Sequence, residues 1–133
     1  MQDRPTAIEL LTSVREFLEQ DVMPGLEGRK RFHALVSANV LAIVARELAG
    51  EETALVGEWQ RLRDLLGVDE TTAPGRLDGL RTAVDALTRR LCDRIRAGDA
   101  DSGAFGDAVR AHVRMTVVEK LRVANPKYLG STT

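Results

Sequence analysis

The sequence predicts an all-α fold, and three observations support this prediction. Apolar residues recur at steps of three and four positions along most of the chain, which is the pattern of one helix face. Aromatic residues make up only 4%, and no stretch alternates apolar and polar residues between turns, so we expect no strand. Glycine and proline separate the periodic segments. These features fit an up-and-down helical bundle of four long helices plus a possible shorter fifth helix. The bundle forms a single domain that covers residues 1–133.

Residues that begin or end helices give the expected boundaries. Gly50 and Gly67 are placed to terminate two of the helices, and Pro126 prevents the last one from continuing. The short helix before Gly67, which carries Trp59, is the possible fifth helix of the bundle. In chain order the expected helices are Pro5 to the Met23-Pro24-Gly25 stop, about Glu27–Ala49, about Glu52–Leu66, about Arg76–Ala97 and about Ala104–Ala124.

Composition disfavours several classes of protein. Nineteen lysines and arginines against twenty aspartates and glutamates give a formal charge of −1, whereas nucleic-acid and anionic-membrane binding domains usually carry a basic excess. The longest weakly polar run, residues 35–45, is too short to span a bilayer. The single cysteine, Cys92, cannot form an internal disulfide, and the N-terminus shows no apolar signal core. We therefore expect a cytoplasmic protein that binds neither nucleic acid nor membrane.

Polar residues interrupt the apolar faces of two expected helices. On a helical wheel Asn39 falls among Phe32, Leu35, Val36 and Ile43, and His112 and Thr116 fall among the apolar residues of the last helix. Buried polar groups need hydrogen-bond partners, so we hypothesise that Asn39, His112 and Thr116 contact one another. Such a network could fix helix register, line a ligand-binding cleft, or make His112 a catalytic base, and the sequence leaves all three open.

Two further sets of residues are candidate binding sites. A cleft between the helices at 27–49 and 104–124 would bind a small molecule and would be lined by His33, Asn39, Arg46, His112 and Thr116. A weaker candidate is an anion site at Gly28, Arg29, Lys30 and Arg31, where free backbone N–H groups and three cations meet at a helix start. The ordinary alternative is an interhelical turn followed by solvated basic side chains.

Metal, cofactor and catalytic motifs are absent from the sequence. Two histidines and one cysteine give no zinc spacing, so we predict no metal and no cofactor. The sequence contains no phosphate-binding Gly-rich loop, no nucleophile elbow and no His-Glu-x-x-His motif. An interaction surface is the simpler expectation, and the short helix with Leu55, Trp59 and Leu62 is the candidate for an exposed apolar patch.

Several strings resemble one family of small bacterial helical proteins of unassigned function. The strings are residues 2–11, Arg31-Phe32-His33, Ala38-Asn39-Val40-Leu41 and residues 123–129. Members of that family are encoded beside, or fused to, a phosphotransferase of the aminoglycoside-kinase type, often near an acyl-CoA dehydrogenase. The resemblance implies an accessory role around those enzymes and supplies no catalytic residues.

Together these observations favour a non-enzymatic accessory or interaction module. Its expected partner is a phosphotransferase-like kinase or an acyl-CoA dehydrogenase, in acyl-CoA-linked catabolism. The alternative is a small-molecule-binding domain or enzyme that uses the cleft described above. A homodimer is compatible with either function.

Overall fold

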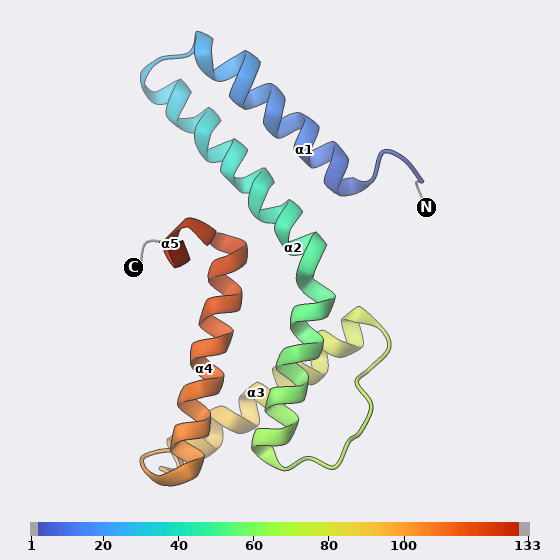
Figure 1. Ribbon diagram of the computed structural model, residues 1–133, viewed down its shortest axis with the longest axis vertical. Coiled ribbons are helices and arrows are strands. Elements are labelled where there is room, and N and C mark those ends of the chain that lie inside the picture. Colours follow the sequence, from blue (N-terminus) through green and yellow to red (C-terminus); the bar gives the residue numbers. More distant parts are fainter. Residues whose placement is uncertain (1–2, 131–133) are drawn as a thin grey trace. The chain divides into compact units, whose positions relative to one another are not determined.

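The computed structural model describes residues 3–130, and the chain within this range is all-α, as predicted. No strand occurs among the described residues, and four of the α-helices are long. In chain order the elements are α1 (Ala7–Phe17), a π-helical turn (Leu18–Val22), a 3-10 turn (Met23–Gly25), α2 (Gly28–Leu66), α3 (Leu77–Arg96), α4 (Gly103–Ala124) and the short α5 (Pro126–Gly130) (Figure 1).

The helices group into two compact units. Unit 1 contains the residues up to Gly50 together with Val123–Asn125, and unit 2 contains Glu51–Arg122 and the residues from Pro126 onward. The boundary falls inside α2, which contributes its first half to unit 1 and its second half to unit 2. The organisation of residues 1–133 as a single domain stays a prediction.

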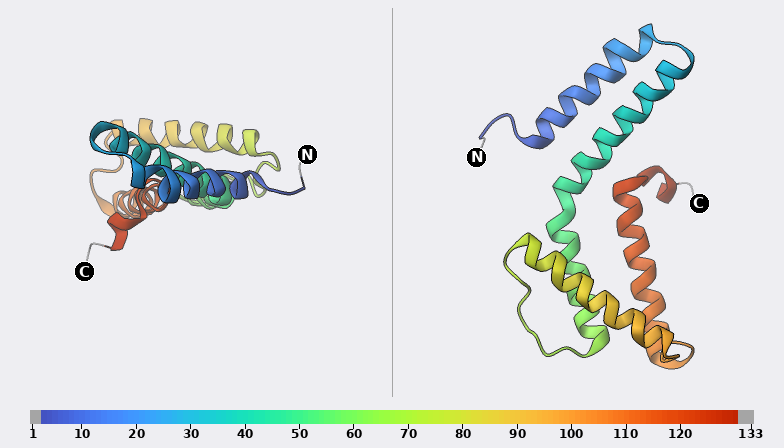
Figure 2. Two further views of the ribbon diagram at one scale, coloured as in Figure 1. Left: turned by 90° about the horizontal axis from the view of Figure 1, so that it is seen from above. Right: turned by 180° about the vertical axis from the view of Figure 1, so that it is seen from behind.

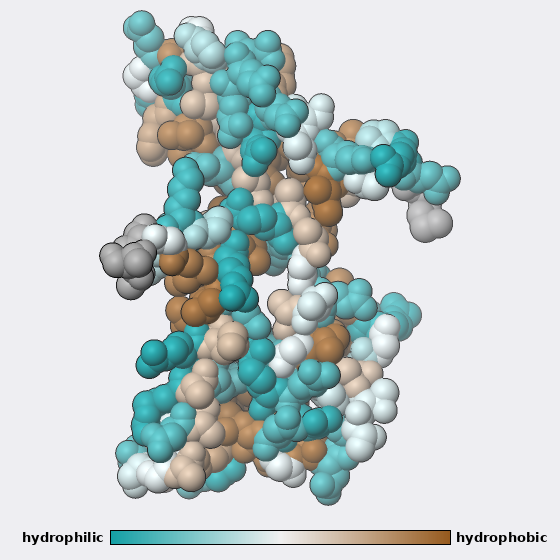
Figure 3. Space-filling model, in the orientation of Figure 1, coloured by the Kyte–Doolittle hydropathy of each residue, from teal (hydrophilic) through white to brown (hydrophobic). Residues whose placement is uncertain are grey.

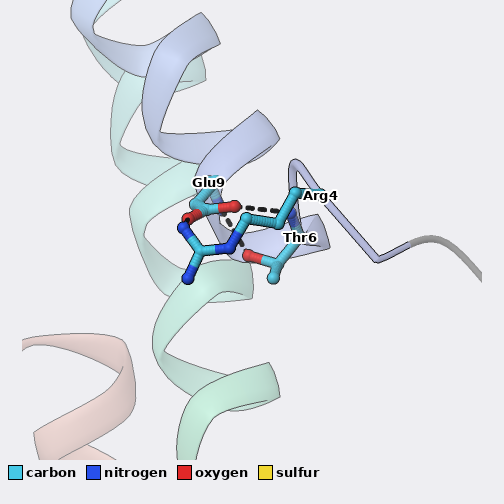
Figure 4. A network of polar contacts seen from close by, with 3 residues as sticks. All are labelled: Arg4, Thr6 and Glu9. Atoms are coloured by element: carbon cyan, nitrogen blue, oxygen red, sulfur yellow. Dashed lines mark hydrogen bonds and ion pairs between the residues drawn. The ribbon is translucent and has the colours of Figure 1, made fainter.

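A capping box determines where α1 begins. The hydroxyl of Thr6 accepts a hydrogen bond from the backbone N–H of Glu9 at 3.2 Å, and the Glu9 carboxylate accepts one from the Thr6 N–H at 2.6 Å (Figure 4). Arg4 adds an ion pair to Glu9 at 3.0 Å. The predicted start at Pro5 is therefore two residues early, because Thr6 and Glu9 satisfy the free N–H groups of the first turn.

In unit 1, α1 runs antiparallel beside the first half of α2 (Figures 1 and 2). The face of α2 toward α1 is built from small side chains spaced at helical intervals. Ala34 and Ala38 are the buried apolar residues among the described part of unit 1, and α1 has no buried residue. The alanines on this face are Ala34, Ala38, Ala42, Ala45 and Ala49. A contact made by alanines brings two helices close together but buries little apolar surface.

One continuous helix replaces two predicted ones. We expected a helix ending at Ala49, a cap at Gly50 and a new helix from Glu52, but α2 runs without interruption from Gly28 to Leu66. Gly50 is not among the glycines with positive φ, so it has no left-handed capping conformation. The helix ends at Gly67, whose φ of +63° is left-handed, as predicted. Glycine costs helix stability without forbidding a helix, and here the helix continues through it.

Unit 2 holds the large apolar core. The second half of α2 contributes Trp59 and Leu62, which are 1% and 0% exposed, and α4 contributes Val109. α3 supplies the rest of the core from one face, namely Leu80, Val84, Leu87 and Leu91. The predicted helices at 76–97 and 104–124 agree closely with α3 and α4, and α4 ends before Asn125-Pro126 as expected.

The start of α4 approaches the preceding loop closely at Gly106. A Cβ atom on Gly106 would lie 2.5 Å from the carbonyl oxygen of Ala100, a distance that real Cβ atoms essentially never show. Gly106 is buried, so the loop before α4 can pack against the helix only because this residue lacks a side chain.

Replacing Gly50 by alanine tests the continuity of α2. Nothing lies within 4 Å of a Cβ atom built at Gly50. We expect Gly50→Ala to raise the free energy of unfolding by about 0.5–1 kcal/mol, because alanine is the better residue inside a helix. Gly106→Ala is the control and should lower it, because its Cβ meets Ala100. Chemical denaturation measures both, and a loss of stability in Gly50→Ala would mean that the helix is broken there.

Candidate functional site

A cluster of polar side chains joins α2 to α4 within unit 2. The Arg61 guanidinium donates two hydrogen bonds to the Glu119 carboxylate, at 3.1 Å to Oε1 and 2.6 Å to Oε2. Both side chains are about three-quarters buried, with 27% and 22% exposure. Paired hydrogen bonds between arginine and a carboxylate fix the geometry of both groups, so this pair sets the position of α4 along α2.

His112 and Thr116 belong to the same cluster. The Thr116 hydroxyl donates a hydrogen bond of 3.5 Å to Oε1 of Glu58 on α2. His112 is buried, with 8% exposure, and its Nδ1 has no hydrogen-bond partner among the described residues. A histidine needs an orienting partner to act as a general base. The hydrogen bonds of this cluster join α2 to α4, and the role of His112 stays a prediction.

The surroundings of His112 favour its neutral form. Burial is the main cause that lowers the pKa of its imidazole below the ordinary 6.5, and the positive charge of Arg61 lowers it further. Glu58 and Glu119 oppose this effect by raising the pKa, and the net direction is downward.

Asn39 belongs to a different unit from this cluster. It is exposed and belongs to unit 1, whereas His112 and Thr116 belong to unit 2. The prediction that Asn39 is buried is therefore wrong. The physical reason is that α1 packs on the alanine face of α2, and Asn39 lies on another face. Contact between Asn39 and the other two residues stays a prediction, and Thr116 has Glu58 as its partner instead.

The remaining cleft residues occupy separate environments. Arg46 donates a hydrogen bond of 2.7 Å from Nε to the carbonyl of Val123 within unit 1. It also lines a hollow of about 230 Å³ between α1 and α2, whose other lining residues include Leu11 and Ala45. His33 is exposed and lies edge-on to the Phe32 ring, with 5.9 Å between ring centroids. The predicted five-residue cleft is spread over both units and stays a prediction.

The residues of the candidate anion site lie exposed at the start of α2, and anion binding there stays a prediction. Gly28 begins α2 with a φ of +55°, and Arg29, Lys30 and Arg31 are all exposed. Arg31 is engaged by the chain itself, because its Nη1 donates a 2.9 Å hydrogen bond to the carbonyl of Met23. No group of three or more potential metal ligands occurs among the described residues.

The predicted apolar patch at Trp59 is not exposed. Trp59 and Leu62 are buried in the core of unit 2, and Leu55 packs against that core. The prediction of an exposed patch is wrong because this stripe of α2 contributes to the main core of unit 2 together with α3. Exposed large apolar side chains occur in both units, and ten of the fifteen lie in unit 1 on the N-terminal pair of helices, where Figure 3 shows apolar atoms at the surface. The sequence feature that could have predicted the apolar surface of unit 1 is the apolar face of α2, which is wider than one packed helix can cover.

By length and composition α2 could cross a membrane. One such helix is weak evidence, because core helices of soluble proteins and signal sequences near an N-terminus pass the same test.

Residues 24–128 match a family described as a domain of unknown function, DUF6285. The chain belongs to this family. The match covers α2, α3 and α4, and it begins after α1. No curated protein and no solved structure matches the chain. Membership in DUF6285 agrees with the resemblance to an uncharacterised family, and it assigns no activity to any residue.

Glu119→Gln tests the arginine pair of the polar cluster. The substitution keeps the shape of the side chain and removes the charge that Arg61 faces, so we expect unfolding to become easier by about 1–3 kcal/mol. Asp85→Asn is the matched control, because the Asp85–Arg89 pair is exposed, at 61% and 77%. It should change stability by less than about 0.5 kcal/mol. Equal effects in the two variants would show that the Arg61–Glu119 pair has no special structural role.

His112 should make stability depend on pH. Because its pKa is lower in the folded protein than in the unfolded chain, the unfolded chain takes up the proton first as the pH falls. The stabilising contribution is present above the ordinary imidazole pKa of 6.5 and is lost as the pH falls below it. His112→Gln should therefore flatten the fall in unfolding free energy between about pH 7 and pH 5. His33→Gln is the control, because His33 is exposed. Parallel curves of unfolding free energy against pH for wild type and His112→Gln would contradict the assignment of this pH dependence to His112.

Proposed function

We propose that this DUF6285 protein is a non-enzymatic accessory module that binds a protein partner through unit 1. The observation that carries the proposal is the mismatch between burial and hydrophobicity in this unit. The described part of unit 1 buries the small side chains of Ala34 and Ala38, whereas many of its large apolar side chains, Phe17 and Phe32 among them, are exposed. Contiguous exposed apolar surface of this kind is typical of interaction sites.

The outer face of α1 is the surface that we assign to the partner. Leu10, Val14 and Phe17 follow one another at helical spacing and are each about half exposed, at 45%, 50% and 56%. We call these three residues the outer α1 stripe. The opposite side of α1 faces the hollow with Ile8 and Leu11, so the stripe has no role in packing α1 against α2. A helix that presents leucine, valine and phenylalanine at i, i+4 and i+7 suits docking into an apolar groove.

The polar cluster supports the non-enzymatic part of the proposal. Its arginine and glutamates are engaged in pairing α2 with α4, and His112 lacks an orienting partner among the described residues. The identity of the partner rests on the family resemblance. A phosphotransferase-like kinase is the first candidate, and an acyl-CoA dehydrogenase is the second.

Co-purification with the two candidate partners tests this proposal. The tagged protein is co-expressed with the kinase or the dehydrogenase from its own genome, and the complex is quantified by size-exclusion chromatography with light scattering. Wild type should form a stoichiometric complex, and Val14→Glu should weaken it by at least about tenfold, because a charge would be buried in an apolar contact.

Glu16→Gln is the matched control on α1, because Glu16 is exposed and lies outside the outer α1 stripe. It should leave the complex unchanged. The absence of a complex with both enzymes would contradict the proposed partners. A complex that Val14→Glu leaves intact would contradict the assigned surface.

A further inference from the structure

The first half of α2 carries a second apolar face, turned away from the alanines that face α1. We call this face the α2 seam. It consists of Arg29, Phe32, Val36, Val40, Ile43 and Glu47. These residues follow one another at steps of three, four, four, three and four, which is the spacing of the contact positions in paired helices. At about 100° per residue, the seam lies on the opposite side of the helix from the alanines.

Most of the α2 seam is accessible, and Ile43 is partly buried. Phe32 is 60% exposed and Val40 is 51% exposed, although both are large apolar side chains. Arg29 and Glu47, at the two ends of the seam, are exposed and form no ion pair among the described residues. Apolar side chains in the middle and free opposite charges at the ends form a surface that lacks its partner.

We infer that the α2 seam binds the seam of a second copy of this chain in antiparallel orientation. The order of side chains supports this occupant, because the seam is self-complementary when reversed. Val36 meets Val40 of the second copy, Phe32 meets Ile43 of the second copy, and Arg29 meets Glu47 of the second copy. Each contact occurs twice around a twofold axis, as an isologous dimer requires. In a parallel pair, Arg29 would instead face Arg29 of the second copy and Glu47 would face Glu47, so that like charges would meet.

Asn39 gains a role in this arrangement. It lies next to the centre of the seam, between Val36 and Val40 in sequence, and it is exposed. In the dimer it lies close to Asn39 of the second copy. A polar amide at the middle of an apolar helix contact favours one register over others, because any shift leaves the amide against apolar side chains.

Sedimentation velocity over a wide range of concentration tests the inference on the full chain. Wild type should move from the 14.6 kDa monomer to twice that mass as concentration rises. Val40→Glu should abolish the shift, whereas Val14→Glu, in the outer α1 stripe, should leave it unchanged. Because both positions are exposed, circular dichroism should show the same helix content in both variants.

A charge reversal tests the antiparallel register. Arg29→Glu alone and Glu47→Arg alone each place two like-charged contacts in the dimer, so each should raise its dissociation constant by about tenfold. The double variant restores opposite charges and should recover wild-type affinity. Failure of the double variant to recover would overturn the antiparallel pairing.

Other outcomes would overturn the second copy as the occupant. One is a wild-type protein that is monomeric at every concentration. Another is binding to vesicles of phosphatidylcholine and phosphatidylglycerol that Val40→Glu abolishes, which would make the seam a membrane-binding face. The inference does not rest on the proposed function, because the seam and the outer α1 stripe share no residue. Loss of one interaction therefore leaves the other measurable.

Discussion

The close contact between α1 and the alanine face of α2 determines what the rest of unit 1 can do. Ala34 and Ala38 are the buried apolar residues among the described part of this unit, and alanine side chains provide little apolar area. Many large apolar side chains of the same two helices, such as Phe17 and Phe32, stay exposed. A helical hairpin of this kind has few buried contacts of its own, so additional stability has to come from what covers those faces. The outer α1 stripe and the α2 seam are two places where such cover is missing, and Leu35, Val44 and Leu48 add further exposed apolar surface.

Unit 2 buries a larger apolar core, although Val113, Met115 and Val117 of α4 are exposed. Trp59 and Leu62 of α2 are buried in one core with the apolar face of α3, and the Arg61–Glu119 pair fixes α4 against α2. Glu51 adds a bidentate ion pair with Arg81 on α3, whose hydrogen bonds lower the pKa of the Glu51 carboxyl. One continuous helix thus passes from a unit with a thin core into a unit with a substantial one. Under the proposed function, unit 2 is the scaffold and unit 1 is the part that binds.

Sequence patterns predicted the helices well where local signals are unambiguous. Gly67 and Asn125-Pro126 end helices, and the helical wheel correctly placed His112 in the core. Other features could not be predicted, because they depend on which neighbour covers a face. Gly50 has the same local sequence signal whether it caps a helix or continues one. The stripe around Trp59 and the face around Asn39 both appear as apolar stripes, yet α2 buries the first in unit 2 and leaves the second exposed. Periodicity identifies an apolar face but does not identify its partner.

Hydrogen exchange measured at low and high protein concentration tests the central claim that unit 1 is incompletely covered in the single chain. Exchange of backbone amides reports local opening, which is more frequent where few apolar contacts hold a helix. At low concentration, the amides of residues 28–48 should exchange much faster than those of α3, although both segments are helical. At high concentration, protection should rise in residues 28–48 and stay unchanged in α3. Equal protection of both segments at every concentration would show that the α1–α2 pair is stable without a partner, which contradicts the account.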